Sequence, residues 1–347
     1  MSIDEKDAAR KLSRLWADRS IPALETKGKK YVIISDIHLG NGGKADDCRK
    51  NRDALARALD YYRKNGYSLI MIGDIEELWQ FELHEIVAEY DRLIYSKVRA
   101  FGDDRVFRVY GNHDDLWGCP DDPTRNKPIR SAASTEALKL KDARRRIRLL
   151  LVHGHQGSKE SDKTSWFSRF AVRVYRGIEP YVKFDRHSSA TKSRITKNYE
   201  RVLYSWAKKA KVILICGHSH RAIFASKSYA DRLKKEMERL QAVILASPGK
   251  KKILKQTYKA LRKVHDALLD EEQKNRDIDP AEKLGDPLPC YFNTGCGVFT
   301  DGMTAIEIVD DKIKLVKWHR KPKKGETHIT FPDCEGSLSQ FVKEVNG

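Results

Sequence analysis

Five short motifs rich in metal-binding side chains occur in a fixed order along this chain of 347 residues. They are Asp36-Ile37-His38, Gly73-Asp74, Gly111-Asn112-His113-Asp114, His153-Gly154-His155 and Gly217-His218-Ser219-His220. Carboxylate, amide and imidazole groups suit Mn, Fe, Zn or Co, and no cysteine stands at a candidate ligand position. Any one of these motifs alone is more often a capping pair or a turn. Five of them in order indicate a two-metal site that hydrolyses phosphoesters.

Each motif directly follows a short run of β-branched and aliphatic residues. The runs cover residues 31–35, 69–72, 106–110, 149–152 and 212–216. Runs of this length and composition predict buried strands. In open α/β folds the ends of such strands meet at one edge of a sheet, so we expect the ligands to converge there. Glycines inside the motifs permit the sharp turns that direct the next side chain toward the site.

The set of motifs resembles that of the calcineurin-like metallophosphoesterases over about residues 30–320. The resemblance implies that seven residues bind two divalent transition-metal ions, with Mn favoured over Fe, Zn and Co. One metal would take Asp36, His38 and His220, the second would take Asn112, His153 and His218, and Asp74 would bridge the two.

The same resemblance implies a role for the histidine of the third motif. His113 would lie beside the substrate and protonate the leaving-group oxygen, a step typically worth about 10²–10⁴-fold. Asp114 would hold the tautomer of that imidazole. A hydroxide activated by the two metals would be the nucleophile. For His155 two positions are open, near the metals or in the loop with a hydrogen bond to the backbone, and the second is preferred.

The C-terminal part of the chain predicts a β-hairpin. Residues 303–309 and 312–318 alternate apolar and polar side chains on either side of Asp310-Asp311, which predicts two strands with one solvent-exposed face. In the family that the motifs resemble, such strands would complete the second sheet of a four-layer αββα sandwich. We therefore expect an α/β fold of two mixed sheets with helical insertions.

We expect a single metallophosphoesterase domain over residues 1–347. Residues 156–210 hold 13 Lys or Arg against 5 Asp or Glu, with aromatic residues at helical spacing. This stretch is predicted either as a basic lid over the site or as an ordinary amphipathic helix on the sheet. Residues 225–289 predict an inserted helical hairpin, because Pro248-Gly249 separates two helical stretches. Residues 4–18 predict a short amphipathic helix.

The net charge of +18 makes anionic phosphate-containing substrates, nucleic acids and anionic membrane surfaces candidate partners. The charge is spread along the chain, and no nucleic-acid-binding module is recognisable. No apolar run reaches membrane-spanning length, the N-terminus lacks a charged-then-apolar leader, and the six cysteines have no Cys-x-x-Cys spacing. These features predict a cytoplasmic protein without a transmembrane segment and leave the oligomeric state open.

The residues after Asp74 narrow the class of enzyme. Ile75-Glu76-Glu77-Leu78-Trp79 differs from the pattern of protein Ser/Thr phosphatases, and Glu77 stands where purple acid phosphatases carry a tyrosine ligand. The Gly-Asp-Ile-x-x-x-Trp pattern and Arg221 look more like bacterial UDP-2,3-diacylglucosamine pyrophosphatases, although His113 stands where those enzymes usually carry Arg. We expect a phosphodiesterase or pyrophosphatase. The alternatives are a nuclease and a non-catalytic phosphate-binding adaptor.

Overall fold

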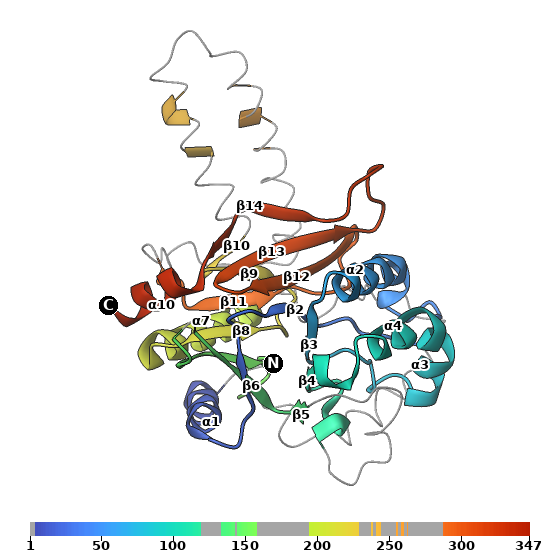
Figure 1. The fold of residues 1–347 in the computed structure, drawn as a ribbon, viewed down its shortest axis with the longest axis horizontal. Coiled ribbons are helices and arrows are strands. Elements are labelled where there is room, and N and C mark those ends of the chain that lie inside the picture. Colours follow the sequence, from blue (N-terminus) through green and yellow to red (C-terminus); the bar gives the residue numbers. More distant parts are fainter. Residues whose placement is uncertain are drawn as a thin grey trace.

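Two mixed sheets of seven strands each lie at the centre of the molecule (Figure 1). The computed structural model describes residues 4–118, 133–142, 144–157, 194–228 and 287–347, with a few further positions between 237 and 262. The strand order of the first sheet is β14 (Ile329–Ser337), β13 (Lys312–His319), β12 (Gly302–Val309), β2 (Lys30–Ile34), β3 (Ser68–Ile72), β4 (Val106–Val109) and β5 (Ala133–Thr135). That of the second is β1 (Ala23–Glu25), β6 (Ala137–Lys141), β7 (Ile147–Val152), β8 (Ile213–Cys216), β11 (Tyr291–Thr294), β9 (Ala222–Phe224) and β10 (Lys227–Ser228).

The five strands predicted to precede the motifs are present as β2, β3, β4, β7 and β8, with ends within two residues of those expected. In β2, Tyr31 and Ile33 pack between the two sheets, whereas Val32 and Ile34 pack against helices on the other face. Burial on both faces explains why these runs are continuously apolar. Strands β2 to β5 run parallel, as do β7, β8 and β11, so each group presents its carboxyl ends at a single edge.

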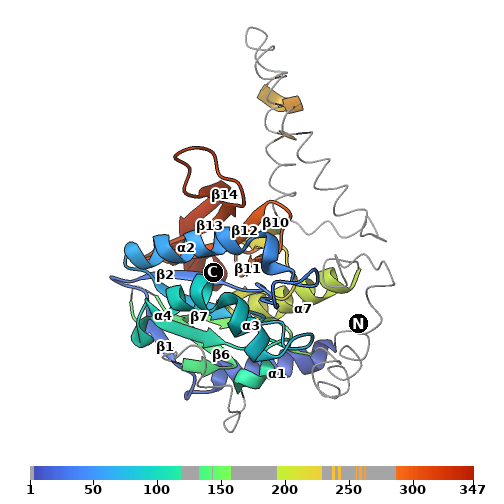
Figure 2. The same cartoon turned by 90° about the vertical axis from the view of Figure 1, so that its right-hand side faces the viewer.

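Helices cover the outer face of each sheet (Figures 1 and 2). The first sheet is covered by α2 (Arg52–Lys64), α3 (Leu83–Tyr90) and α4 (Ser96–Arg99), and the second by α1 (Glu5–Ala17) and α7 (Arg194–Ala210). The C-terminal helix α10 (Leu338–Asn346) packs beside the second sheet. Short helical turns span Cys48–Lys50, Asp91–Tyr95, Asp103–Arg105 and Asp115–Gly118. The predicted four-layer αββα sandwich of two mixed sheets is therefore confirmed.

The predicted N-terminal helix is α1, and its start has a local cause. The side chain of Asp4 accepts hydrogen bonds from the backbone N–H groups of Lys6 and Asp7, both at 3.0 Å, which satisfies donors that the first turn leaves free. Leu12 and Leu15 are buried against the second sheet. The amphipathic pattern thus predicted both the helix and its buried face.

The predicted C-terminal hairpin is present as β12 and β13, but the prediction of a solvent-exposed face is wrong for β12. Helix α2 covers the outer face, so the polar side chains of this strand are buried as well. Glu307 is 5 % exposed and accepts a hydrogen bond from the Tyr62 hydroxyl at 2.9 Å. Thr304 lies on the opposite face, between the two sheets, and donates to the Thr294 carbonyl at 2.5 Å. Alternation alone could not reveal that a helix from the N-terminal half lies over these residues.

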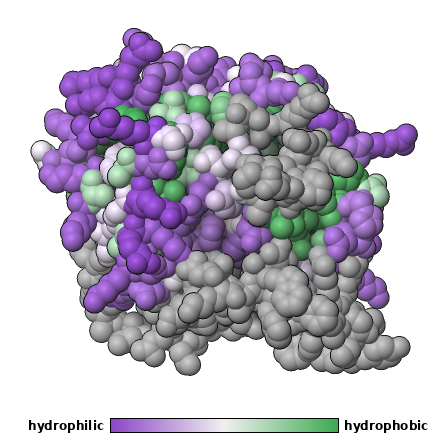
Figure 3. All heavy atoms as spheres, turned by 90° about the horizontal axis from the view of Figure 1, so that it is seen from below, coloured by the Kyte–Doolittle hydropathy of each residue, from purple (hydrophilic) through white to green (hydrophobic). Residues whose placement is uncertain are grey.

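Most of the two predicted special segments lies outside the described residues. Of the predicted lid at 156–210, residues 194–210 form α7, and of the predicted insertion at 225–289, the described positions between 237 and 262 are helical. Within the described ranges, no helix combines the length and the apolar character needed to cross a membrane. Figure 3 shows hydrophilic side chains spread over much of the described surface on the face seen from below.

Candidate metal centre

The five motif loops converge where the carboxyl ends of strands from both sheets meet. The loops after β2, β3 and β4 come from the first sheet, and those after β7 and β8 from the second. Direct contacts join the sheets here. The backbone N–H of His218, from the second sheet, donates to the two carboxylate oxygens of Asp36, from the first, at 3.0 and 2.9 Å. Within the second sheet, the N–H of Gly217 donates to the carbonyl of His153 at 2.9 Å. The predicted convergence of the motifs is therefore observed.

The backbone of these loops is crowded and strained. A Cβ atom on Gly111 would collide with the carboxylate of Asp74, and one on Gly217 would collide with that of Asp36. Left-handed φ angles of 50° to 65° occur at five candidate ligands, namely Asp36, His38, Asp74, His218 and His220. Such a conformation costs a non-glycine residue about 1–2 kcal/mol. Strain of this kind clusters at functional sites, where the surrounding structure holds it in place.

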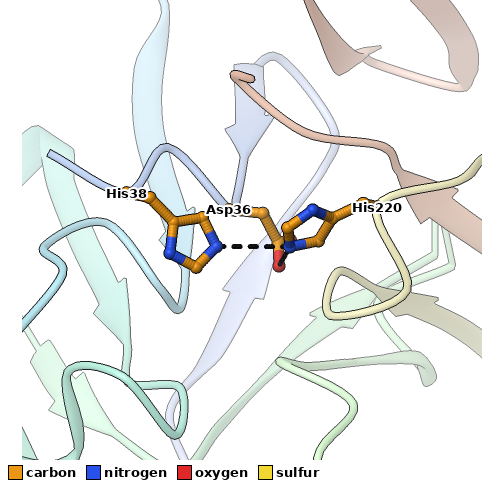
Figure 4. A group of neighbouring side chains, drawn as sticks. All are labelled: Asp36, His38 and His220. Carbon is orange, nitrogen blue, oxygen red and sulfur yellow. Dashed lines mark hydrogen bonds and ion pairs between the residues drawn. The ribbon is translucent and has the colours of Figure 1, made fainter. Parts of the chain in front are cut away.

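A first cluster of candidate ligand atoms combines Asp36, His38 and His220 (Figure 4). The Nε2 atom of His220 lies 3.2 Å from Asp36 Oδ1 and 3.2 Å from His38 Nε2. All three candidate ligand atoms lie within 4.8 Å of one another. Two imidazole nitrogens and a carboxylate oxygen that face one another at such distances form a suitable donor set for a divalent cation.

A second cluster combines Asp74, His153 and His218. His153 Nδ1 donates to the carbonyl of Ile72 at 2.9 Å, so Nε2 carries the lone pair whenever the imidazole is neutral. That Nε2 atom is buried, lies 3.0 Å from Asp74 Oδ2 and makes no hydrogen bond to any described residue. The Oδ1 atom of Asn112, in the neighbouring loop, is also buried without such a partner. Buried polar atoms rarely stay unpaired, so the two orphaned atoms fit ligands of a cation.

The electrostatics of the clusters favour ionised carboxylates. Burial raises the pKa of Asp74, but His153 and His113 outweigh it and hold the pKa well below its usual range. The pKa of Asp36 is lowered in the same way, mainly by His220. Burial lowers the pKa of His218 to about 3, which keeps its imidazole neutral and able to donate a lone pair. A cation bound here would stabilise the ionised carboxylates in place of the positive charge of protonated histidines.

His113 lies next to the first cluster and is held by two neighbours from the loop after β3. Its Nδ1 atom lies 2.8 Å from Glu77 Oε1, and the other oxygen of Glu77 lies 2.9 Å from Nδ1 of His38. The Trp79 ring is stacked on the His113 ring at 4.1 Å between centroids. Burial lowers the pKa of His113, but Glu77 and Asp74 outweigh it and raise the pKa to about 9. The His113 side chain remains 22 % exposed.

The prediction that Asp114 orients His113 is wrong, because Glu77 occupies that place. Asp114 is fully buried and accepts hydrogen bonds from the backbone N–H groups of Gly111 and Ile75 at 2.6 and 2.9 Å. Its Oδ2 atom also lies 2.8 Å from Nη2 of Arg108. Through these hydrogen bonds, Asp114 joins the loop after β3 to the loop after β4. Glu77, three residues after Asp74, was visible in the sequence, but nothing there showed which carboxylate would reach His113.

His155 lies beside the second cluster, with its ring centroid 5.5 Å from that of His153. Burial lowers the pKa of His155 well below its usual value, and its Nδ1 has no hydrogen-bond partner within the described ranges. The backbone hydrogen bond considered for this histidine is therefore not made through Nδ1. His155 stays a neutral neighbour of the cluster.

Comparison with known proteins agrees with this site. Residues 29–222, which include all seven candidate ligands, match the sequence pattern of the calcineurin-like phosphoesterases. The chain therefore belongs to the calcineurin-like phosphoesterase family. Among solved structures, it is similar to a conserved uncharacterized protein from Streptococcus pneumoniae TIGR4 described as a predicted phosphoesterase, with 12 % identity, a TM-score of 0.32, and coverage of 89 % of this chain and 95 % of that one. No curated protein matches the chain.

Proposed function

We propose that this protein is a metal-dependent hydrolase of phosphodiester or pyrophosphate bonds. The observation that carries the proposal is the arrangement of two donor clusters, around Asp36 and Asp74, with the partly exposed His113 anchored beside them in a third group with His38 and Glu77. Asp74 lies between these parts, since its Oδ1 accepts from the N–H of His113 at 2.9 Å and its Oδ2 faces His153. A phosphate-binding adaptor would need cations or basic groups but no anchored proton donor.

The proposed ligands are those that the motifs predicted. Asp36, His38 and His220 would hold one divalent cation, Asn112, His153 and His218 would hold the other, and Asp74 would contact both. When bound, such a pair of cations activates water and offsets the negative charge of a phosphoryl group. The carboxylate, amide and imidazole donors suit Mn, Fe, Zn and Co alike, and Mn is proposed among them on the family resemblance.

The chain's own residues would then manage the proton of the leaving group. A carboxylate only accepts hydrogen bonds, so the Nδ1 atom of His113 must donate to Glu77. The Nε2 atom is then the only ring nitrogen of His113 that can hold a transferable proton. In this proposal the proton moves from Nε2 to the leaving-group oxygen as the P–O bond breaks. A charged Glu77 beside the ring stabilises the protonated imidazole before transfer.

The substrate class rests on sequence similarity and on charge. The resemblance to UDP-2,3-diacylglucosamine pyrophosphatases favours a pyrophosphate or diester, and the net charge of +18 favours a polyanionic substrate such as nucleic acid as the second candidate. Arg221, part of that resemblance, forms an ion pair with Glu200 of α7 beside the centre. Those pyrophosphatases usually carry an Arg where this chain has His113. This difference counts against the same lipid-linked substrate.

The proposal is tested with the full-length protein reconstituted with Mn²⁺. Elemental analysis should find two metals per chain, and hydrolysis should be measured with bis-para-nitrophenyl phosphate, para-nitrophenyl phosphate, nucleotide diphosphate sugars and oligonucleotides. Asp74→Asn should lose at least one metal and nearly all activity, whereas Asp103→Asn, at an exposed helical turn, serves as control. Fewer than one metal per wild-type chain would contradict the two-metal proposal. Binding of these compounds without hydrolysis would support the adaptor alternative.

A further inference from the structure

The side chain of Trp79 is stacked face to face on the imidazole of His113. The two ring centroids lie 4.1 Å apart and the ring planes differ by 22°. Trp79 stays partly exposed, whereas Leu78 and Phe81 on either side are 4 % and 2 % exposed and belong to the core between the first sheet and its helices. The turn thus buries its aliphatic and phenyl side chains and leaves the indole beside the candidate centre.

Backbone hydrogen bonds fix the position of this turn relative to His113. The N–H of Leu78 donates to the carbonyl of His113 at 3.2 Å, and the N–H of Glu77 donates to the carbonyl of Leu39 at 3.0 Å. Within the turn, the carbonyl of Glu77 accepts from the N–H of Phe81 at 3.0 Å. The loops after β2, β3 and β4 are therefore joined, and the backbone that carries the indole is fixed relative to His113.

Three contacts hold the His113 ring, and each restrains it at a different place. The covalent bond to Cβ and the hydrogen bond from Nδ1 to Glu77 restrain the ring at two points on its edge, but neither packs against its face. The Trp79 face fixes the plane of the ring. His38 closes one edge, with its ring 4.9 Å away at an interplanar angle of 87°.

Core packing alone does not account for a tryptophan at this position. The indole Nε1 atom is buried and has no hydrogen-bond partner among the residues that the structure describes. Buried indole N–H groups usually find an acceptor, and leaving one unpaired is unfavourable. Leucine or phenylalanine would fill a packing site without this cost. Stacking of the large indole face on His113 offsets the cost of the unpaired N–H.

We propose that Trp79 is a positioning residue that acts through His113. Its indole confines the imidazole to the orientation in which Nδ1 meets Glu77 and Nε2 is free to deliver a proton. This inference rests on the proposed general-acid role of His113. Trp79 itself touches the histidine and is assigned no step of the chemistry.

The test compares Trp79→Leu, Trp79→Phe and the control Trp16→Leu, a partly buried tryptophan on α1 outside the site. Trp79→Leu should slow hydrolysis of esters with poor leaving groups about 3- to 10-fold, the size expected for one aromatic contact. It should change para-nitrophenyl esters by less than about 2-fold, since para-nitrophenolate needs no proton. Trp79→Phe should retain most activity, and Trp16→Leu should leave the ratio of the two rates unchanged.

A double mutant and a spectroscopic measurement separate this inference from the proposed function. In the His113→Ala background, Trp79→Leu should have no further effect. In metal-free protein, NMR relaxation of the His113 side chain should report a more mobile ring in Trp79→Leu. Equal slowing with and without His113, or an unchanged ring mobility, would overturn the positioning role. If His113→Ala alone has no effect on poor leaving groups, the general-acid proposal fails, and the NMR comparison still decides whether Trp79 holds the ring.

Discussion

At the scale of single residues, the centre is built from groups whose protonation and tautomer are set by their neighbours. Asp36 and Asp74 are held as carboxylates, and the hydrogen bond from His153 Nδ1 to the Ile72 carbonyl directs Nε2 toward Asp74. Glu77 serves two imidazoles with its two oxygens. Each of these arrangements prepares an atom for a cation or a proton, which is why substitutions here should change chemistry more than stability.

The role of His113 is separable from that of its neighbour Asn112. His113→Ala should leave both metals bound and slow hydrolysis of poor leaving groups by about 10²–10⁴-fold, with a much smaller effect on para-nitrophenyl esters. Asn112→Ala should disturb the metals, because its buried Oδ1 is the candidate ligand, and slow both substrate types alike. Metal content and kcat for both variants on both substrates decide this. Loss of metal in His113→Ala, or equal slowing of the two ester types, would show that the acid role is wrong.

Glu77 is expected to couple the first cluster to His113. A carboxylate accepts from the Nδ1–H of His38 and of His113 at once, whereas a glutamine offers one accepting oxygen and a donating amide. In Glu77→Gln, one imidazole must therefore move its proton to Nε2. We expect a loss of about 10- to 100-fold in metal affinity or activity, as for other partners of metal-binding histidines. Chelator competition and kcat measure it, with the exposed Glu335→Gln as control. Changes under about 2-fold in both quantities would count against the coupling.

At the scale of elements, the loops after β3 and β4 are fixed by a buried charged group beneath them. Arg108 on β4 is 1 % exposed, forms ion pairs with Glu76 and Asp114, and lies 3.9 Å from the centroid of the Trp117 ring. Burial raises the pKa of Glu76 despite the arginine. Disruption of this network should lower the free energy of unfolding strongly, because loss of the arginine leaves buried carboxylates without a counter-charge.

Arg108→Met should therefore lower the free energy of unfolding by about 3–5 kcal/mol. The matched control is Lys97→Met, which removes the partly exposed ion pair with Asp60 and should cost less than about 1 kcal/mol. Chemical denaturation of both variants measures the difference. If the two substitutions cost the same, the buried network does not support the loops in the way inferred here.

The elements also show which parts of the structure can be predicted from sequence. The strands were predictable because β-branched runs ended at motif residues, and the convergence of the candidate ligands was predictable because such strand ends meet at one edge of a sheet. The partner of His113 was not, since Asp114 and Glu77 are both carboxylates near it and only the fold decides which one reaches the ring. The sequence also did not predict that α2 covers β12, because this contact depends on packing between distant segments.

At the scale of the whole molecule, the charge of +18 exceeds what a small phosphate substrate requires. Basic residues are spread over the sequence rather than confined to the candidate centre, and residues 156–210 hold 13 Lys or Arg against 5 Asp or Glu. The described end of this stretch is α7, whose Glu200 pairs with Arg221 beside the centre and whose Tyr199 ring lies 5.4 Å from that of His218. Tyr199 and Glu200 of α7 therefore bring the described end of this stretch to the candidate centre.

If the substrate is a nucleic acid, this stretch should contribute phosphate contacts that salt weakens. For duplex DNA, log Kobs should fall with log[salt] by about 0.9 for each contact. Lys208→Gln with Lys209→Gln, both exposed on α7, should reduce the slope, whereas Lys323→Gln with Lys324→Gln, equally exposed but far along the chain, should not. Fluorescence anisotropy with labelled DNA at several salt concentrations measures both slopes. Binding that is absent or insensitive to salt would exclude the polyanion and favour a small phosphodiester or pyrophosphate, because a single phosphate site cannot produce a steep salt dependence.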